Sequence, residues 1–439
     1  MEQSKKIGVI SLGCDKNRVD TEKMLAILTC EHTLTDDFEQ AEIIVVNTCA
    51  FLESARKEAV EEILSASALK TVGKLEKLIV TGCLPQKFID DIFEEFIEVD
   101  AFLGVSDYDK ILSVIDELYK NGQRINAVGQ VKGECGKKRV RTTQNYTYLK
   151  IADGCANHCT YCLIPKIRGK YRSVAFNDLI EETKGLGRVE ELILVAQDVT
   201  RYGIDLTPKR SLVELIKALS LLENVGSIRL LYCYPECVDD ALIQELKTND
   251  KLLKYIDIPL QHADNKILKR MNRRGTAESY LELIEKLKRE VKGIAIRSTF
   301  ITGFPGEEDQ HFNNLLTFIE KAKLFNAGFF AYSREEGTPA YNLDGQVPQK
   351  VKTQRLKKLY SAQKKIVKQN SKEIIGQTVK ALAEGFDQDQ LVYYGRAYFN
   401  APDIDGKVYF FSGDEVVYGE YYDVEIIKAT GYDLYGERL

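Results

Sequence analysis

Three cysteines lie close together in the pattern C-x3-C-x2-C: Cys155, Cys159 and Cys162. Three thiolates on one loop can ligate three irons of a cubane cluster, which leaves the fourth iron open to a substrate or cofactor. A structural zinc site is normally closed by a fourth ligand. His158 could supply that ligand, but it lies between two of the cysteines on a tight loop. The pattern therefore favours an open-iron cluster over zinc.

Three further cysteines, Cys14, Cys49 and Cys83, are distant in sequence but share one local setting. Each lies in a loop between a short apolar run and a helical pattern. The apolar runs are 7–10, 43–46 and 78–80, and the helical patterns are 19–28, 50–69 and 86–96. This alternation predicts a parallel α/β sheet. Loops of this kind meet at the carboxyl edge of such a sheet, where ligands bind, so we expect the three cysteines to lie near one another.

The remaining cysteines are Cys30, Cys135, Cys233 and Cys237. Cys233 and Cys237 lack a third ligand, so we interpret them as structural thiols, and we assign no role to the other two. The chain has 439 residues, 44% of them hydrophobic, and no run of about 18 apolar residues that could cross a membrane. Spaced cysteines in a chain of this size more often bind metal or do catalysis than form disulfides. We therefore expect a cytoplasmic protein without a membrane segment.

The chain divides into three units. An open parallel α/β unit spans 1–130, a basic linker spans 131–145, a central α/β unit spans 146–372, and a C-terminal unit spans 373–439. Six candidate strands in the central unit predict a partial (β/α)6 barrel: 147–152, 191–196, 227–232, 255–258, 295–301 and 326–332. The C-terminal unit predicts a small antiparallel β-barrel, with strands such as 378–383, 391–397, 415–418 and 421–429.

Charge is distributed unevenly over these units. The whole chain carries a net charge of −5, whereas residues 375–439 alone hold 12 acidic and 5 basic residues. The helical pattern from Lys350 to Lys372 has nine Lys and Arg residues and no acid. Two interpretations of this helix stay open, namely a solvated packing helix and a surface for an anionic partner.

The C-x3-C-x2-C loop, with Tyr161 before its last cysteine, resembles the signature of the radical S-adenosylmethionine (SAM) superfamily. Other segments of the chain narrow the resemblance to the methylthiotransferases, and residues 375–439 are similar to that family's TRAM domain. The matching segments are 153–155, 162–169 and 303–307, together with the loops of the three N-terminal cysteines. Segments 11–17, 168–173, 196–198 and 332–338 are most similar to the branch that acts on a ribosomal protein. Cys233 departs from the family pattern, in which an apolar residue is expected.

The resemblance implies two 4Fe-4S clusters, one on each cysteine triplet, and two SAM molecules consumed per product. It also implies candidate SAM contacts. The turn with Gly303, Pro305 and Gly306 could offer backbone N–H groups to SAM. Arg297 could pair the SAM carboxylate and Glu191 the amino group, although a structural ion pair is the alternative for both. Gln197 ends a strand on the face where ligands bind.

The resemblance implies methylthio transfer to the β-carbon of an aspartate in the twelfth small-subunit ribosomal protein. A tRNA adenosine is the alternative substrate. The acidic C-terminal unit argues for a basic protein partner, because an RNA-binding barrel should be basic. A non-catalytic iron–sulfur scaffold is a third hypothesis, but it has no need for two open-iron sites. The ribosomal protein could be free or assembled in the ribosomal subunit, and both alternatives stay open. We further expect an electron donor such as flavodoxin or ferredoxin, no membrane association, and a monomer.

Overall fold

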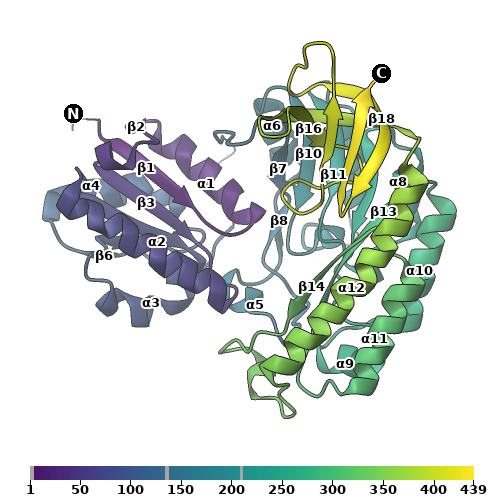
Figure 1. Ribbon diagram of the computed structural model, residues 1–439. Coiled ribbons are helices and arrows are strands. Elements are labelled where there is room, and N and C mark those ends of the chain that lie inside the picture. Colours follow the sequence, from purple (N-terminus) through teal and green to yellow (C-terminus); the bar gives the residue numbers. More distant parts are fainter. Residues whose placement is uncertain (1–3, 134–137, 208–210) are drawn as a thin grey trace.

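The computed structural model describes residues 4–133, 138–207 and 211–439, so Cys135 and part of the predicted linker lie outside the described residues. The chain forms an N-terminal α/β unit, a central α/β unit and a C-terminal β-barrel, in that order (Figure 1). Among the described helices, none combines the length and apolar character needed to cross a bilayer.

The N-terminal unit is built on a six-stranded parallel sheet. Its strand order is β2-β1-β3-β4-β5-β6. The strands are β1 (Lys6–Ser11), β2 (Thr33–Leu34), β3 (Ile43–Thr48), β4 (Lys77–Gly82), β5 (Ala101–Phe102) and β6 (Ile125–Asn126). The helices are α1 (Asp15–Leu28), α2 (Glu53–Val72), α3 (Cys83–Glu95) and α4 (Ile111–Asn121). Alternate residues of β3 and β4 pack on opposite faces, with α1 and α4 covering one face and α2 and α3 the other. This confirms the predicted open α/β sheet.

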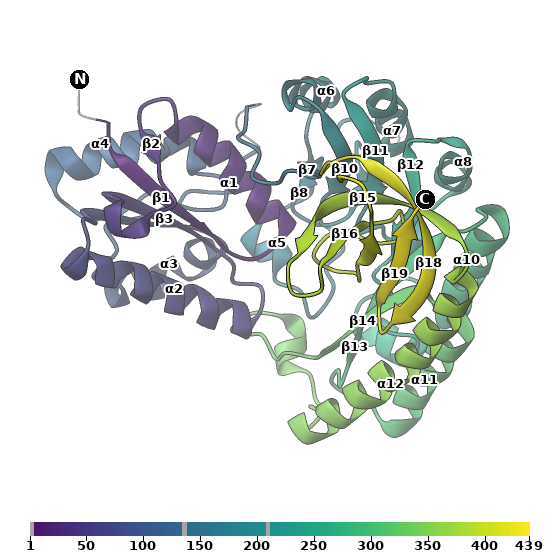
Figure 2. The same ribbon diagram turned by 45° about the horizontal axis from the view of Figure 1, so that its top comes forward.

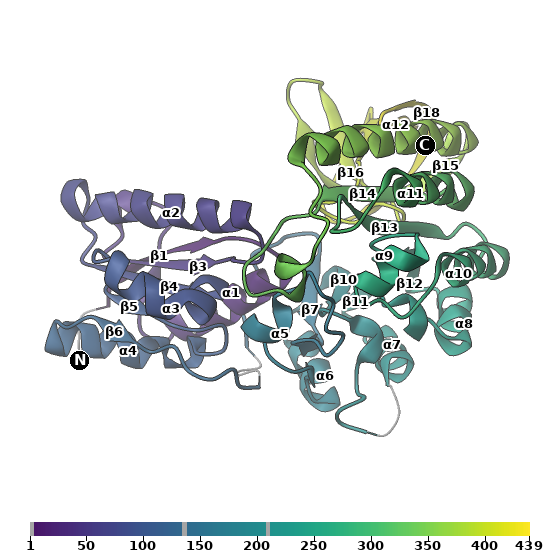
Figure 3. The ribbon, with the colours of Figure 1, turned by 90° about the horizontal axis from the view of Figure 1, so that it is seen from below.

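The central unit is a second six-stranded parallel sheet, in the order β14-β13-β12-β11-β10-β7. All six predicted strands are present: β7 (Thr147–Lys150), β10 (Val189–Val195), β11 (Val225–Leu230), β12 (Leu252–Asp257), β13 (Ala295–Thr302) and β14 (Asn326–Ala331). The principal helices are α6 (Phe176–Gly185), α7 (Leu212–Ser220), α8 (Asp240–Thr248), α10 (Ala277–Glu290), α11 (Asp309–Ala322) and α12 (Gln349–Ile374). They cover one side of the curved sheet, as Figure 3 shows. This is the partial barrel that the sequence predicts.

The C-terminal unit is a closed five-stranded barrel in the order β15-β16-β17-β19-β18. Its strands are β15 (Thr378–Asp387), β16 (Val392–Arg396), β17 (Val408–Phe411), β18 (Tyr421–Thr430) and β19 (Asp433–Arg438). The prediction of a strand at 415–418 is wrong, because only Val416 of that segment is buried and the segment is a loop. β17 and β19, which the sequence analysis did not identify, close the barrel by pairing with each other.

The small barrel packs against the sheet face that the helices leave uncovered (Figure 2). Ile193 and Val195 of β10 point to this side and share a core with Val379 and Phe399 of the C-terminal unit. The neighbouring Leu192 and Leu194 point to the helices instead. The helices therefore cover one face of the central sheet and the small barrel packs on the other.

Candidate functional site

The N-terminal cysteines lie at the carboxyl ends of three adjacent strands. Cys14 follows β1, Cys49 follows β3 and Cys83 follows β4, and these strands pair side by side. Gly13 shows how close the loops come, since it adopts a φ of 87° and a Cβ there would lie 2.5 Å from the Cys49 Cβ. Asn17 ties the loops together by donating hydrogen bonds to the carbonyls of residues 12 and 48, at 3.0 and 2.9 Å.

The C-x3-C-x2-C loop follows β7, an edge strand of the central sheet, and the short strand β8 (Ala152–Asp153), and it is anchored at several points. Gly154 opens the loop with a φ of 75°, and a Cβ there would lie 2.2 Å from the Lys170 carbonyl oxygen. Asn157 donates to the Asp198 carboxylate at 3.0 Å. Thr160 donates its backbone N–H to the carbonyl of residue 271 at 3.1 Å. The three cysteines are therefore held on a loop of defined conformation.

Arg168 connects the two cysteine sites. It follows the short helix α5 (Ile164–Ile167), directly after the cysteine loop, and is 1% exposed. Its guanidinium donates to Asp20 of α1 and to Asp153 of the central unit, each at 2.9 Å. It also donates to the Asn17 side-chain oxygen at 2.6 Å and approaches the Cys83 sulfur to 3.9 Å. A side chain of the central unit thus reaches the N-terminal cysteine site.

Lys150 completes this buried network. Its ammonium group donates to Asp20 and also lies 3.4 Å from an oxygen of Asp153. Asp153 in turn accepts the backbone N–H of Gly154 at 2.8 Å, one residue before Cys155. The two cations stabilise the ionised form of Asp153, and despite its burial they hold its pKa below the usual range. A continuous set of charged contacts therefore joins Cys83 to the start of the cysteine loop.

A second arginine accompanies the cysteine loop itself. The Arg273 guanidinium lies 3.9 Å from the Cys159 sulfur and stacks over the Tyr234 ring at 4.0 Å. The Tyr234 hydroxyl is 3.8 Å from the same sulfur. Each cysteine triplet thus has one buried guanidinium beside one of its sulfurs, which suits anionic ligands.

Burial keeps several of these thiols protonated in the metal-free chain. It raises the pKa of Cys83 and of Cys162 to about 12, and it also raises the pKa of Cys49 and of Cys155. Since a metal ligand must be the thiolate, metal binding has to release these protons. The positive charge of a metal held by these residues would supply the compensation.

Two sets of three cysteines with no carboxylate make a donor set of the kind that iron–sulfur clusters use. Among the described residues, no group of three or more His, Cys, Asp or Glu side chains is arranged to hold a single metal ion. A cubane cluster instead spreads three thiolates over three irons, so its ligands surround a space and do not converge on one point. Soft thiolates with no carboxylate among them are also the ligands that iron–sulfur clusters use.

The Gly303–Gly306 turn lies beside the cysteine loop. Phe304 packs edge-on against Tyr161 of that loop, with ring centroids 6.4 Å apart. The Gly303 N–H donates to the Glu307 carboxylate at 2.7 Å, and the Gly306 N–H donates to the residue 345 carbonyl at 2.8 Å. The turn therefore lies beside the cysteine loop, and two of the backbone N–H groups that were predicted to meet SAM already donate within the chain.

Glu307 and His262 form a buried pair at this turn that the sequence analysis did not predict. His262 Nε2 lies 3.3 Å from one Glu307 oxygen, and Arg355 of α12 donates to the other at 2.8 Å. Although burial disfavours the charged form, these partners and the Thr302 hydroxyl keep the pKa of Glu307 below its usual value. The pair fixes the turn that follows β13.

Gln197 lies at the carboxyl end of β10, close to the cysteine loop. Its amide nitrogen donates to Asp153 at 3.0 Å. Its amide oxygen is buried and has no hydrogen-bond partner among the described residues. An unpaired buried acceptor at this position suits a ligand that donates a hydrogen bond.

The structure does not bring Glu191 and Arg297 to the cysteine loop. Glu191 accepts from Arg229 at 2.5 Å and from Arg396 of the C-terminal barrel at 2.7 Å. Arg297 donates to Asp257 at 2.9 Å and lies 3.6 Å from Asp405 of the same barrel. Both side chains lie where the small barrel meets the sheet, and both have the ion-pair partners of the alternative interpretation.

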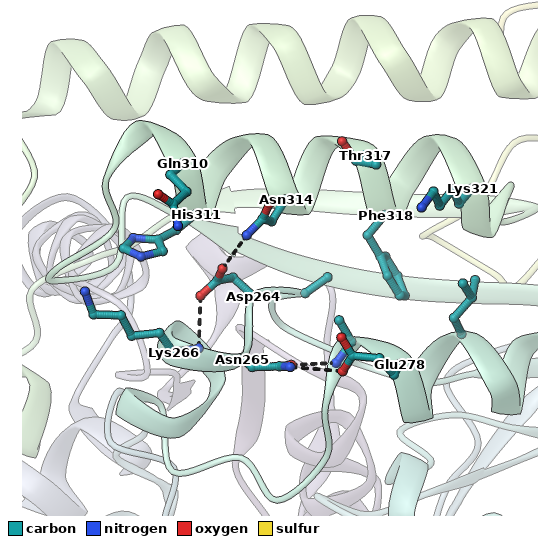
Figure 4. A pocket seen from close by; sticks show the side chains of 13 residues that line it. Asp264, Asn265, Lys266, Glu278, Gln310, His311, Asn314, Thr317, Phe318 and Lys321 are labelled. Carbon is teal, nitrogen blue, oxygen red and sulfur yellow. Dashed lines mark hydrogen bonds between the residues drawn. The ribbon is translucent and has the colours of Figure 1, made fainter.

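An open hollow of about 490 Å³ lies among α9 (Asn265–Arg270), α10 and α11 (Figure 4). Asp264, Lys266, His311 and Asn314 are among its lining residues, and Asn314 donates to Asp264 at 2.7 Å. No cysteine of the described part of the chain lines it. This hollow on the helical layer is therefore separate from the two cysteine sites.

Arg168 and Arg273 are the functional candidates that the sequence analysis missed. Arg168 belongs to the segment 162–169 that carries the family resemblance, so a signal was present, but no local pattern shows that it contacts Cys83, which is 85 residues away. Arg273 lies in an ordinary basic stretch without any such signal.

Three family models match the chain. The Uncharacterized protein family UPF0004 matches residues 6–104, the Radical SAM superfamily matches 149–319, and the TRAM domain matches 375–439. Two relatives, from Acetivibrio thermocellus and Lachnoclostridium phytofermentans, are both described as ribosomal protein uS12 methylthiotransferase RimO. The first is 45% identical over 99% of this chain and 98% of its own length. The second is 45% identical over 98% of this chain and 99% of its own length.

Solved structures with the same fold are more distant in sequence. The radical SAM methyltransferase TsrM from Kitasatospora setae, with cobalamin and a [4Fe-4S] cluster bound, aligns with a TM-score of 0.56 at 14% identity and covers 77% of each chain. The cobalamin-dependent SAM radical enzyme OxsB aligns at 0.51 and 12% identity, over 84% of this chain and 56% of OxsB. These alignments show the fold alone. On its near-full-length similarity to the curated relatives, the chain belongs to the RimO family of ribosomal protein uS12 methylthiotransferases.

Proposed function

We propose that this protein is a radical SAM methylthiotransferase that adds a methylthio group to the β-carbon of an aspartate in ribosomal protein uS12. The observation that carries the proposal is the pair of three-cysteine sites, joined by the buried side chain of Arg168. The names of the near-full-length relatives support the substrate. A ribosomal-protein substrate implies that the reaction takes place in the cytoplasm.

The substrate C–H bond is unactivated, and a side-chain base at pH 7 does not remove such a proton. When bound, the iron–sulfur clusters and SAM supply the radical and sulfur chemistry. In this proposal Cys155, Cys159 and Cys162 hold one cluster, and a second is held by Cys14, Cys49 and Cys83. We further propose flavodoxin or ferredoxin as the electron donor and a monomeric enzyme.

Other residues of the chain bind and orient. The unpaired amide oxygen of Gln197 is available to a donor group of SAM. The rings of Phe304 and Tyr161 pack against each other at the turn that contains Gly303, Pro305 and Gly306, and they exclude water from it. Glu191 and Arg297 act in the proposal by holding the small barrel on the sheet.

The test is anaerobic reconstitution followed by SAM, dithionite and a uS12 peptide. Wild-type protein should release 5′-deoxyadenosine and increase the peptide mass by one methylthio group. C155A/C159A/C162A should lose both signals, whereas C14A/C49A/C83A should lose the methylthio product while still cleaving SAM. Modification of tRNA nucleosides with no change in the peptide would overturn the proposed substrate, and failure of wild-type protein to cleave SAM would overturn the proposed chemistry.

A further inference from the structure

Helix α12 presents seven exposed lysines, which we call the α12 lysine face: Lys350, Lys357, Lys358, Lys364, Lys365, Lys368 and Lys372. At about 3.6 residues per turn, they fall within about a third of the helix circumference, opposite the buried side. The only acidic residue of the helix is Glu373, in its last turn. The exposed side of α12 therefore carries one sign of charge over nearly its whole length.

Lys358 lies over the Phe312 ring at 5.8 Å, but in the described structure none of these lysines pairs with a carboxylate as Arg355 of the same helix does. Lys352 donates to the Tyr332 carbonyl at 2.7 Å, and Arg355 pairs with Glu307 at 2.8 Å. Within the described part of the chain, no member of the α12 lysine face has a carboxylate within ion-pairing distance. Pairs such as Lys364 and Lys368 lie four residues apart, where like charges destabilise a helix. A surface that costs the fold stability in this way suits an external anion.

The position of α12 relates this face to the proposed site. At its N-terminal end, Lys352 packs against Gly303 of the turn beside the cysteine loop. At its C-terminal end, Val367 and Ile374 share a small cleft with Phe399 and Leu434 of the small barrel. Figures 1 and 3 show α12 extending along the outside of the molecule between these two ends. The α12 lysine face therefore runs from the edge of the proposed site to the acidic barrel.

Length and charge identify the partner. From Lys350 to Lys372 the face extends about 33 Å, at about 1.5 Å per residue, which matches a repeating polyanion better than a single anionic group. The phosphate backbone of RNA is such a polyanion, and it is bound through lysine and arginine without regard to sequence. The adjacent barrel has the opposite character, with 12 acidic and 5 basic residues from 375 to 439. It repels RNA and attracts a basic protein.

We propose that the α12 lysine face binds the phosphate backbone of ribosomal RNA, so that the enzyme acts on uS12 assembled in the small ribosomal subunit. This inference rests on the proposed function, because a basic protein surrounded by RNA is the partner that fits both charged surfaces at once. In this proposal the α12 lysine face positions the small ribosomal subunit, and the reaction takes place at the cysteine sites.

The first test measures RNA binding by the reconstituted full-length protein. The probe is a fluorescent RNA duplex, and anisotropy gives the dissociation constant from 50 to 200 mM NaCl. K357E/K364E/K368E should bind the RNA at least tenfold more weakly. The slope of log K against log salt concentration should be smaller in magnitude by about two to three. The matched control K120E/K247E/K254E changes three exposed lysines of other elements by the same charge and should bind like wild type. Equal weakening in both variants, or no RNA binding by wild type, would overturn the inference.

The second test separates this inference from the proposed function. Methylthiolation is measured on purified small subunits and on a free uS12 peptide. K357E/K364E/K368E should raise KM for subunits at least tenfold and leave kcat/KM for the peptide within twofold of wild type. Unchanged KM for subunits would overturn the RNA contact while leaving the methylthiotransferase proposal intact. If the variant has normal RNA affinity but flavodoxin reduces its iron–sulfur clusters more slowly, the α12 lysine face binds an acidic protein instead. That result would also overturn the RNA contact.

Discussion

The Arg168 guanidinium lies 3.9 Å from the Cys83 sulfur, although the two residues belong to different units of the chain. The same guanidinium bridges Asp20 of the N-terminal unit and Asp153 of the central unit. Arg168 therefore supplies positive charge to the site of Cys14, Cys49 and Cys83. It also holds the N-terminal unit against the central unit, which carries the other cysteine site.

Replacing Arg168 by Met should destabilise the junction between the two units. Removing one cation of this buried ion-pair network leaves Lys150 as the cation that the Asp20 and Asp153 carboxylates share, at a cost of about 3–5 kcal/mol. Denaturant unfolding of the metal-free chain measures this free energy. Arg188→Met is the control, because Arg188 is 67% exposed in its ion pairs and should change stability by less than about 1 kcal/mol. Equal, small effects of both substitutions would contradict the structural role of Arg168.

Iron content should divide equally between the two cysteine triplets. C14A/C49A/C83A and C155A/C159A/C162A should each bind about half the iron of wild type, since each removes one cubane site. Iron and sulfide analysis after anaerobic reconstitution measures this. Cys30→Ala is the control, because Cys30 is exposed and lies outside both triplets. Full iron content in either triple variant would exclude a cluster at that site.

Glu191→Gln distinguishes a SAM ligand from a structural ion pair. In the structure, the Glu191 carboxylate compensates Arg229 and Arg396, and the pKa of Glu191 is lowered because these two cations outweigh its burial. We expect the substitution to lower the unfolding free energy by several kcal/mol and to leave SAM affinity in the reconstituted protein unchanged. Calorimetry measures both quantities. A loss of SAM affinity without a loss of stability would restore the role predicted from sequence.

The contribution of Glu307 to stability should depend on pH with a defined sign. Its pKa is lowered in the folded state, so its contribution is complete above the unfolded value of about 4.3 and is lost as the pH falls through the folded value. Glu307→Gln should therefore cost about 2 kcal/mol at pH 7 and progressively less below pH 4. Denaturant unfolding of the metal-free chain measures the difference. The exposed Glu336→Gln is the control, and a penalty for Glu307→Gln that grows toward acid pH would contradict the assignment.

The sequence predicted those parts of the site that depend on local order. Strand, loop and helix follow one another at Cys14, Cys49 and Cys83, and the parallel sheet then brings the three loops to one edge. The spacing of Cys155, Cys159 and Cys162 is likewise a local signal. Both the fold class and the six central strands followed from patterns of this kind.

Contacts between distant units could not be predicted in this way. Glu191 at the start of a strand has the same local pattern whether it binds a ligand or pairs with Arg396, which is 205 residues away. The contact of Arg168 with Asp20 spans 148 residues and depends on how the two sheets dock. The segment 415–418 has strand-forming residues but no partner strand, and pairing rather than propensity decides that outcome.

The central claim is tested most directly by mass spectrometry of uS12 from cells with and without the gene for this protein. The account predicts that an aspartate of uS12 carries a methylthio group in the parent strain, loses it on deletion, and regains it with the wild-type gene but not with C155A/C159A/C162A. A uS12 protein with the same mass in all strains, accompanied by a methylthio change in tRNA nucleosides alone, would contradict it.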